Sequence, residues 1–504
     1  MLRKIPKTMA TQHPDNTLPA YWLGKEFIST YEEVEECYHM FKDLKVDEYM
    51  WDWEGKFVDE SVLEKLFRDH YDYFKKNQLG KDKFLTFRLP NIWQERGYRL
   101  ARAFMNILSN EDLGHDFNFH SPPVFEVILP MTKKVSELIH INSVFNQLAQ
   151  FKKNVFGSNG EYLEKLSVIP LIEETKLMVG LDKFLEDYLV EYTKQMNESL
   201  PDLRVFMARS DPAMNTGIVP SVISVKAAMS HIANFEKEKG IPSYSWLGAG
   251  SLPFRGGNNP DNYKAIVNEY AGLSSISIQS AFRYDYNLPD VKKAINYYNE
   301  HLQSKYNNTL ILDKSEIKLI SEINSIFTKE FQQTIPDIAD TINLVASKIP
   351  KRRERVLHIG LFGYSRGVGK VKLPRAIKFT GSLYSLGIPP ELIGTGRGLK
   401  ELKKRGYLEF LSKVYKHLAD DLNRAGHYLN KENLEMLCKK DKVWDTVRED
   451  IDNISDYLGE ELGPKTTHHF IHRNLVSTVY YKMLNNEDFS PEIVMSGQIR
   501  KSLG

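Results

Sequence analysis

The stretch that decides the fold is Val168-Ile-Pro-Leu-Ile-Glu173, a short apolar run that stops at a carboxylate. Such a run is typical of a buried strand. Seven similar runs lie between Thr8 and Ile278, and nearly every one stops at a charged or polar residue suited to chemistry. These seven are Thr8–Gln12, Glu48–Trp53, Phe84–Phe87, Val124–Leu129, Val205–Ala208, Ser243–Leu247 and Ser275–Ile278.

The intervals between these runs have room for one helix and two loops each. Apolar side chains recur with one-face helical spacing over Glu33–Leu44, Ser61–Lys75 and Ser221–Lys239. Strand followed by helix, repeated, predicts parallel βα units. Eight such units close an α/β fold of the (β/α)8 barrel type, whose chemistry lies at the carboxyl ends of the strands.

The pattern changes after about Leu288, where helical spacing replaces the strand signal. We expect residues 1–288 to form the barrel and residues 289–504 to form a mainly helical region that packs on it, not an independent domain. No linker rich in Pro, Gly or Ser separates the two parts. The expected helices are Val291–Lys305, Lys314–Thr328, Leu399–Arg424 and Thr466–Asn485.

One stretch of the second part, Gly360–Gly398, is rich in glycine and is expected to be an irregular loop. Long loops inside compact proteins are usually functional or disordered, and this one carries apolar side chains that do not suit a disordered tail. We expect it to supply active-site bases. Its basic residues are Arg366, Lys370, Lys372, Arg375, Lys378 and Arg397.

The charge balance gives no reason to expect a polyanionic partner. The chain has 504 residues with 67 basic and 66 acidic side chains, a net charge of +1, so neither nucleic acid nor an anionic membrane is expected as the main partner. The only cysteines, Cys37 and Cys438, suit a reducing compartment. No apolar run reaches the ~18 residues of a membrane span. These features predict a cytoplasmic enzyme.

Glu173 and Asp211 stand at the ends of two successive predicted strands. Neighbouring barrel strands would aim both carboxylates at one point, where they would suit Mg²⁺ or Mn²⁺ together with water and a substrate phosphate. A plainer interpretation stays open, in which each carboxylate pairs with an arginine such as Arg209. Glu174 alternates away from Glu173 and is expected to have a lesser role.

Two arginines also follow predicted strands. Arg255 lies in the glycine-rich turn Gly248–Gly257, whose backbone N–H groups can cradle an anion. Arg88 follows Phe84–Phe87, where a guanidinium can hold a phosphate or carboxylate through two parallel hydrogen bonds. The alternatives are an ordinary strand-to-helix connection for the turn and a structural ion pair for Arg88.

The histidines are candidates of two kinds. His13 precedes Pro14, which restrains its backbone, and at the mouth of a barrel it is a candidate general acid or base. His468, His469 and His472 have helical spacing and are expected to form an exposed patch, with zinc as an outside alternative. Together the candidates describe a site for a small polyanion on a divalent metal.

Several motifs are specific enough to suggest a family. Ala10–Asn16 carries His13 in a context similar to a T-A-H-P-T motif, Ile169–Glu173 is similar to V-P-L-F-E, and Ser210–Ala213 is similar to S-D-S-A. Together these motifs resemble the archaeal-type, short form of phosphoenolpyruvate carboxylase, essentially from end to end. Further matching segments are Arg88, Arg255–Gly257, Tyr364–Arg366, Pro374–Ile377, Ile388–Gly396 and Ser496–Gly504.

The resemblance implies carboxylation of phosphoenolpyruvate by bicarbonate to oxaloacetate and phosphate. It implies that Glu173 and Asp211 hold Mg²⁺ or Mn²⁺, and that Arg88 and Arg255 hold the phosphoryl and carboxyphosphate oxygens. It implies that His13 takes the carboxyphosphate proton, which releases CO₂ beside the enolate. A homotetramer, built as a dimer of dimers, and allosteric control are implied in the same way.

The chain departs from the family's pattern in several places, and two of them concern the substrate site. Ala249 and Met214 stand where an arginine and a lysine would be. We expect the missing charge to come from the loop beyond the barrel, from Lys370, Lys372 or Arg397. Two alternatives stay open: another metal-dependent barrel enzyme acting on phosphoenolpyruvate or an oxo acid, and a non-catalytic metabolite sensor.

Overall fold

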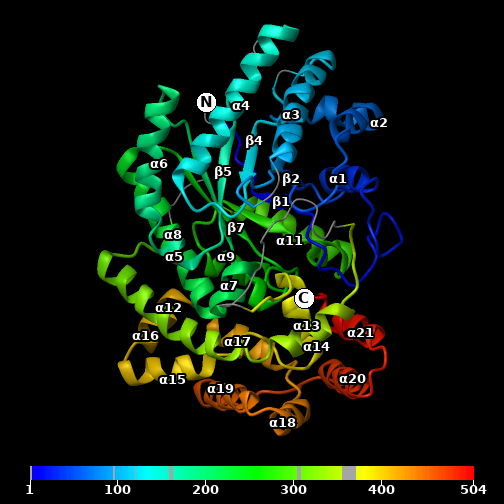
Figure 1. The fold of residues 1–504 in the computed structure, drawn as a ribbon, viewed down its shortest axis with the longest axis vertical. Coiled ribbons are helices and arrows are strands. Elements are labelled where there is room, and N and C mark those ends of the chain that lie inside the picture. The colour runs from blue at the N-terminus through cyan, green and yellow to red at the C-terminus, as the bar shows by residue number, and fades with distance from the viewer. Residues whose placement is uncertain (1–2, 95–96, 120, 158–162, 303–307, 355–370) are drawn as a thin grey trace.

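The computed structural model describes residues 3–94, 97–119, 121–157, 163–302, 308–354 and 371–504. Figure 1 shows a barrel wrapped by helices in its upper part and a layer of further helices in its lower part. The amino-terminal half of the chain, drawn from blue to green, makes the barrel. The helices drawn from yellow to red make the lower layer.

Eight parallel strands close into one barrel in chain order, because β1 pairs with both β2 and β8. The register places Met9 opposite Glu48 on one side and opposite Ser277 on the other. Each strand lies at one of the predicted runs, so the predicted barrel is confirmed. The strands are β1 Thr8–Ala10, β2 Glu48–Asp52, β3 Phe84–Arg88, β4 Glu126–Leu129, β5 Ser167–Ile172, β6 Leu203–Ala208, β7 Ser243–Gly248 and β8 Ser275–Ile278.

Helices connect the strands and cover the outside of the barrel, as expected for βα units. Their bounds are α1 Glu33–Lys42, α2 Val62–Lys76, α3 Tyr98–Asp116, α4 Val135–Phe156, α5 Thr175–Val179, α6 Leu181–Met196, α7 Ser210–Thr216, α8 Ile218–Lys239, η1 Pro253–Arg255, α9 Tyr263–Glu269, α10 Ser280–Tyr284 and α11 Leu288–His301. Among the described residues, α8 alone is long and apolar enough to cross a membrane. The most apolar part of α8 is 89% buried inside the fold, which is typical of a core helix.

The barrel interior separates a buried ionic network from the mouth. At the amino-terminal end of the strands, Arg204 donates to Glu48 at 2.8 Å and to Glu126 at 3.0 Å. Its guanidinium carbon lies 4.7 Å from the ring centre of Trp246, which stacks on Phe206 at 3.8 Å. These apolar rings close the barrel, so chemistry is confined to the opposite end.

The chain beyond the barrel is helical, as expected, but two details of the prediction are wrong. The predicted helix Leu399–Arg424 is three helices, because Gly406 adopts a left-handed φ of 73° and ends the first. The predicted irregular stretch Gly360–Gly398 contains α14 and the start of α15, since its apolar side chains pack in the core. The helices are α12 Lys314–Thr334, α13 Ala339–Lys348, α14 Ala376–Ser385, α15 Thr395–Arg405, α16 Leu408–Val414, α17 Leu418–Gly426, α18 Lys431–Lys440, α19 Val443–Leu458, α20 Thr467–Leu484 and α21 Ser490–Arg500.

These helices pack directly on the βα units at the mouth. Helix α12 contacts α7 and α8, while α14 and α17 contact η1 in the glycine-rich turn. One polar contact crosses this junction: the carboxylate of Glu391 accepts a hydrogen bond from the backbone N–H of Phe254 and another from the hydroxyl of Tyr384, both at 2.8 Å. The carboxyl-terminal helices therefore form one wall of the barrel mouth.

Candidate active site

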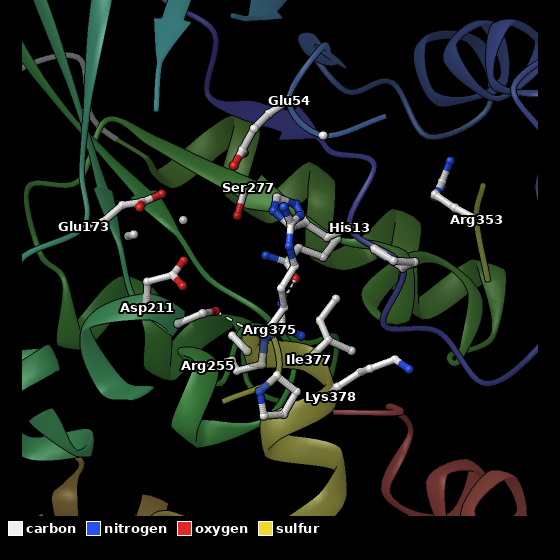
Figure 2. A pocket seen from close by; sticks show the side chains of 18 of the residues that line it. His13, Glu54, Glu173, Asp211, Arg255, Ser277, Arg353, Arg375, Ile377 and Lys378 are labelled. Atoms are coloured by element: carbon white, nitrogen blue, oxygen red, sulfur yellow. Dashed lines mark hydrogen bonds between the residues drawn. The ribbon is translucent and has the colours of Figure 1, made fainter. Parts of the chain in front are cut away.

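A cavity of about 450 Å³ opens at the carboxyl ends of the strands, between the barrel and α14. Figure 2 shows Glu173 and Asp211 together at one side of it, with His13, Arg255 and Arg375 gathered opposite them. The predicted site residues that line the cavity are His13, Arg88, Glu173, Asp211, Arg255 and Arg375. The strand ends thus converge on one space, and α14 adds to it.

Glu173 and Asp211 reach the cavity from neighbouring elements. Glu173 directly follows β5, and Asp211 lies in the first turn of α7 after β6. Arg209 does not line the cavity. Its Nε donates to the hydroxyl of Tyr270 at 3.0 Å, and it also contacts Ser221. The arrangement therefore presents two carboxylates to one space, a donor set of hard oxygens that suits a divalent cation.

Glu174 points elsewhere, as the alternation of side chains predicts. Its carboxylate pairs with Lys133 at 2.7 Å, and both side chains are about half exposed. An exposed pair of this kind contributes little to stability. Glu174 is consequently a surface residue, in agreement with the lesser role expected for it.

His13 sits on the segment that leaves β1. Its Nδ1 lies 2.8 Å from the hydroxyl of Thr11, and its carbonyl accepts from the backbone N–H of Asp15 at 3.1 Å and of Ser280 at 3.4 Å. Backbone and ring are thus both held by neighbouring groups. The imidazole lines the cavity as predicted.

Arg88 lines the cavity while holding two carboxylates of its own. Its Nε and one terminal nitrogen donate to Asp52 at 2.8 and 2.7 Å, and the other terminal nitrogen lies 3.1 Å from Glu54. Burial alone would lower the pKa of the guanidinium, but Asp52, Glu54 and Glu173 raise that pKa above its usual range. The ion pair weighed from sequence is therefore present, and it fixes a permanent cation at the edge of the cavity.

Arg255 is extensively bonded, and only 1% of it is exposed. Its guanidinium donates to four groups, at distances between 2.6 and 3.2 Å. Glycine permits this placement: a Cβ on Gly250 would lie 2.8 Å from the guanidinium carbon. The acceptors are Ser210 Oγ, Asp15 Oδ2, Gln279 Oε1 and the carbonyl oxygen of Gly504. Arg255 therefore joins four distant segments at the cavity wall.

The predicted loop bases separate into four groups. Arg375, at the start of α14, lines the cavity, and so does Lys378. Lys372 is exposed and is not among the lining residues. Arg366 and Lys370 lie outside the described residues.

Arg397 forms the fourth group, because it does not line the cavity. It lies on α15, where its guanidinium donates to Asp450 at 2.9 and 3.0 Å and to Glu330 at 3.2 Å. Its backbone N–H donates to Asp450 as well. The close packing of α15 on α19 commits this side chain to a structural pair away from the cavity, so Arg397 does not replace the charge missing at Ala249 and Met214.

A basic segment that sequence reasoning missed runs along the cavity at residues 351–353. Arg352 donates to the carbonyls of Asn16 and Thr17, each at 3.2 Å, and Arg353 donates to Glu36 at 2.6 Å. Burial would raise the pKa of Glu36, but Arg353 and Arg283 lower it to about 2. Three consecutive bases in the sequence were the available signal. Arg352 fastens the segment that follows His13 to the helical region.

The histidines of α20 do not form the exposed patch that was predicted. His468 is exposed, but His472 is fully buried, and its Nε2 lies 3.3 Å from Arg500. Burial and this neighbouring cation hold the pKa of His472 well below its usual value. Among the described residues, no group of three His, Cys, Asp or Glu side chains is placed to bind a metal.

Comparison with known proteins identifies the family of this chain. A family model described as phosphoenolpyruvate carboxylase matches residues 5–504. The chain belongs to the phosphoenolpyruvate carboxylase family. A phosphoenolpyruvate carboxylase of Oenococcus oeni is 40% identical over 479 residues, covering 94% of each chain.

Archaeal relatives match over almost the whole chain. A phosphoenolpyruvate carboxylase of Metallosphaera sedula is 37% identical, covering 100% of both chains, and one of Picrophilus torridus is 36% identical, covering 99% of both. The resemblance seen in the motifs is therefore confirmed along the full length, including the helical region that walls the cavity.

Proposed function

We propose that this protein catalyses the bicarbonate-dependent carboxylation of phosphoenolpyruvate to oxaloacetate and phosphate. The observation that carries the proposal is the meeting of Glu173 and Asp211 with His13 and the cations Arg88 and Arg375 in one cavity, in a chain matched over residues 5–504 by the family model. Carboxylates, a titratable imidazole and fixed cations are the groups that this reaction requires.

We further propose that Glu173 and Asp211 hold Mg²⁺ or Mn²⁺. Two carboxylates supply oxygen donors and leave positions for water and substrate oxygens, which such ions retain in enzyme sites. When bound, the ion would act as a Lewis acid on substrate oxygens.

The protein's own groups divide the remaining work. Arg88 presents positive charge that the pair with Asp52 and Glu54 keeps in place, so a phosphoryl group would meet a preorganised cation. Arg375 and Lys378 bring charge from α14 to the cavity, which offsets the absence of basic side chains at Ala249 and Met214. Arg255 lines the cavity with its donors directed at protein acceptors, and its binding of carboxyphosphate oxygens stays a prediction.

His13 is proposed as the base that takes the proton of carboxyphosphate once bicarbonate has attacked the phosphorus. Loss of that proton releases CO₂ and phosphate, and the methylene carbon of the enolate then attacks CO₂. The cavity walls from the barrel and α14 would restrict water, which would otherwise protonate the enolate to give pyruvate.

The experiment that tests the function measures oxaloacetate with a coupled NADH assay. The purified chain is given phosphoenolpyruvate and Mg²⁺, with and without bicarbonate, and again after treatment with a chelator. We expect oxaloacetate only when both bicarbonate and the metal are present. Turnover of phosphoenolpyruvate at the same rate with and without bicarbonate would indicate another barrel enzyme. Binding of phosphoenolpyruvate without turnover would indicate a metabolite sensor.

Replacing His13 separates phosphate release from carboxylation. For His13→Asn we expect oxaloacetate formation to fall by roughly 100-fold or more, as for loss of a general base, while phosphate release continues with pyruvate as the product. Lactate dehydrogenase and malate dehydrogenase assays on the same reaction give the ratio of pyruvate to oxaloacetate. An unchanged or higher yield of oxaloacetate would contradict the role of His13.

Other expectations remain proposals for this chain. A cytoplasmic location fits its two cysteines, which form no disulfide here. The division into a barrel of residues 1–288 and a helical region of residues 289–504 that is not independent fits the contacts of α12 and α14. A homotetramer and allosteric control rest on the family resemblance.

A further inference from the structure

Thr11 occupies a place at the mouth of the barrel that the proposed reaction does not explain. It follows β1 directly and extends the barrel ladder, since its backbone N–H donates to the carbonyl of Ile278 at 3.1 Å. Its side chain is fully buried. Side chains two apart on an extended segment point the same way, and the hydroxyl of Thr11 indeed lies 2.8 Å from Nδ1 of His13.

The contact selects one edge of the imidazole. A histidine ring is held in one orientation, and in one tautomer, by the partner of whichever nitrogen is bonded. When Nδ1 faces Thr11, Nε2 lies on the other edge of the ring, which is farther from the backbone. If Nδ1 donates its hydrogen to the hydroxyl oxygen, Nε2 keeps a lone pair and can accept a proton.

The hydroxyl is itself fixed from two sides. Thr11 is β-branched, which limits its χ1 rotamers, and its backbone is locked by the ladder to β8. The next residue, Gln12, turns the other way, where its side-chain oxygen accepts from Lys56 at 2.9 Å and from the backbone N–H of Asp52 at 3.1 Å. The contacts of Thr11 and Gln12 thus hold the backbone that precedes His13 in place.

We propose that Thr11 is a positioning residue for His13: its hydroxyl receives the Nδ1 hydrogen and so presents Nε2 as the proton acceptor in the cavity. This assignment rests on the proposed role of His13 in carboxylation. Thr11 does not touch the reacting atoms, and its contribution is the orientation and tautomer of the imidazole.

The test compares Thr11→Val, which keeps the β-branched shape and removes the hydroxyl, with Thr11→Ser, which keeps the hydroxyl. We expect Thr11→Val to lower the kcat for oxaloacetate by roughly tenfold or more, as a misplaced catalytic group does, and to raise the share of pyruvate. The KM for phosphoenolpyruvate should change little. Thr11→Ser should restore both kcat and the product ratio.

A second readout does not depend on activity. In protein labelled with ¹⁵N-histidine, the ring signals of His13, identified by their absence in His13→Asn, should show the hydrogen on Nδ1 in the wild type. Thr11→Val should move these signals towards a mixture of tautomers. A bare Nδ1 in the wild type, or full activity in Thr11→Val, would overturn the proposal.

The two readouts also separate this inference from the function itself. A wild-type protein that makes no oxaloacetate but shows the Nδ1 tautomer would contradict the carboxylase function and leave the Thr11 contact established. Equal losses in Thr11→Val and Thr11→Ser, with a higher KM and a lower unfolding midpoint in both, would assign Thr11 to packing alone. If Thr11→Val does not fold, the Thr11→Ser variant and the wild-type spectrum still decide between these outcomes.

Discussion

Arg88 and Arg397 show that the same residue type, with similar partners, can lie in two different environments. Both are arginines with two carboxylates, yet Arg88 borders the cavity and Arg397 is bound to Asp450 on α19. The sequence places Arg88 at a strand end, where side chains face the mouth. Arg397 lies in a glycine-rich stretch that was predicted to be a loop. It is part of helix α15, where its side chain pairs with Asp450.

A pair of substitutions tests this distinction between arginines. Arg397→Ala leaves Asp450, which is fully buried, without its guanidinium, and we expect unfolding free energy to fall by about 3–5 kcal/mol with kcat unchanged. Arg375→Ala should lower kcat/KM by about 100-fold and leave stability nearly unchanged. Urea unfolding measures the change in stability, and the oxaloacetate assay measures the change in kcat/KM. A loss of activity in Arg397→Ala with a loss of stability in Arg375→Ala would contradict both assignments.

At the scale of elements, strand ends were predictable and the wall opposite them was not. The eight strands could be predicted from short apolar runs. In a parallel barrel the carboxyl ends of all strands lie on one face, which is why Glu173, Asp211 and Arg88 line one cavity. The bases of residues 351–353 come from a short connection after α13. No periodicity reveals where such a connection lies, because its position depends on how the helices dock on the barrel.

The junction between η1 and α14 carries a carboxyl group that should affect stability as a function of pH. Burial raises the pKa of Glu391 from 4.5 to about 7, against the lowering effect of its hydrogen bonds from Tyr384 and Phe254. Between these two pH values the folded protein keeps a proton that the unfolded chain releases. The stability from this group is therefore complete below pH 4.5 and is lost as pH rises towards 7 and beyond.

Glu391→Gln keeps a hydrogen-bond acceptor and removes the titration. We expect its stability relative to the wild type to increase between pH 5 and pH 8, by an amount on the order of 3 kcal/mol, in urea unfolding at each pH. Glu432→Gln, which changes an exposed side chain, should follow the wild type. A constant difference between Glu391→Gln and the wild type would show that Glu391 ionises normally.

On the scale of the whole molecule, the site is held together by residues at the two extremes of the described chain. Leu503 donates its backbone N–H to the carbonyl of Asp15 at 2.8 Å, and Gly504 accepts from Arg255 at 2.6 Å. The motif resemblance named both segments, but spacing along the sequence could not show that they touch. Contacts between such distant residues depend on the complete fold.

Deleting residues 502–504 should separate folding of the barrel from completion of the site. We expect the circular dichroism spectrum to remain largely helical while oxaloacetate formation is lost, because Arg255 and Asp15 lose partners on this segment. Lys501→Asn is the matched control, because it removes an ion pair with Asp261 and a contact with the Tyr286 ring but no partner of Arg255. Asparagine also tolerates the positive φ of 56°. Full activity in the deletion variant would show that Arg255 needs no partner there.

The meeting of Arg255 with Gly504 also sets an order of events during synthesis. The last barrel strand, β8, ends at Ile278, but the acceptor that completes the Arg255 cluster is made only with Gly504. At roughly 5–20 residues per second, tens of seconds of translation separate the two. During that interval the nascent chain contains all eight barrel strands but lacks the acceptor that completes the Arg255 cluster. We therefore expect activity only once Gly504 has left the ribosome.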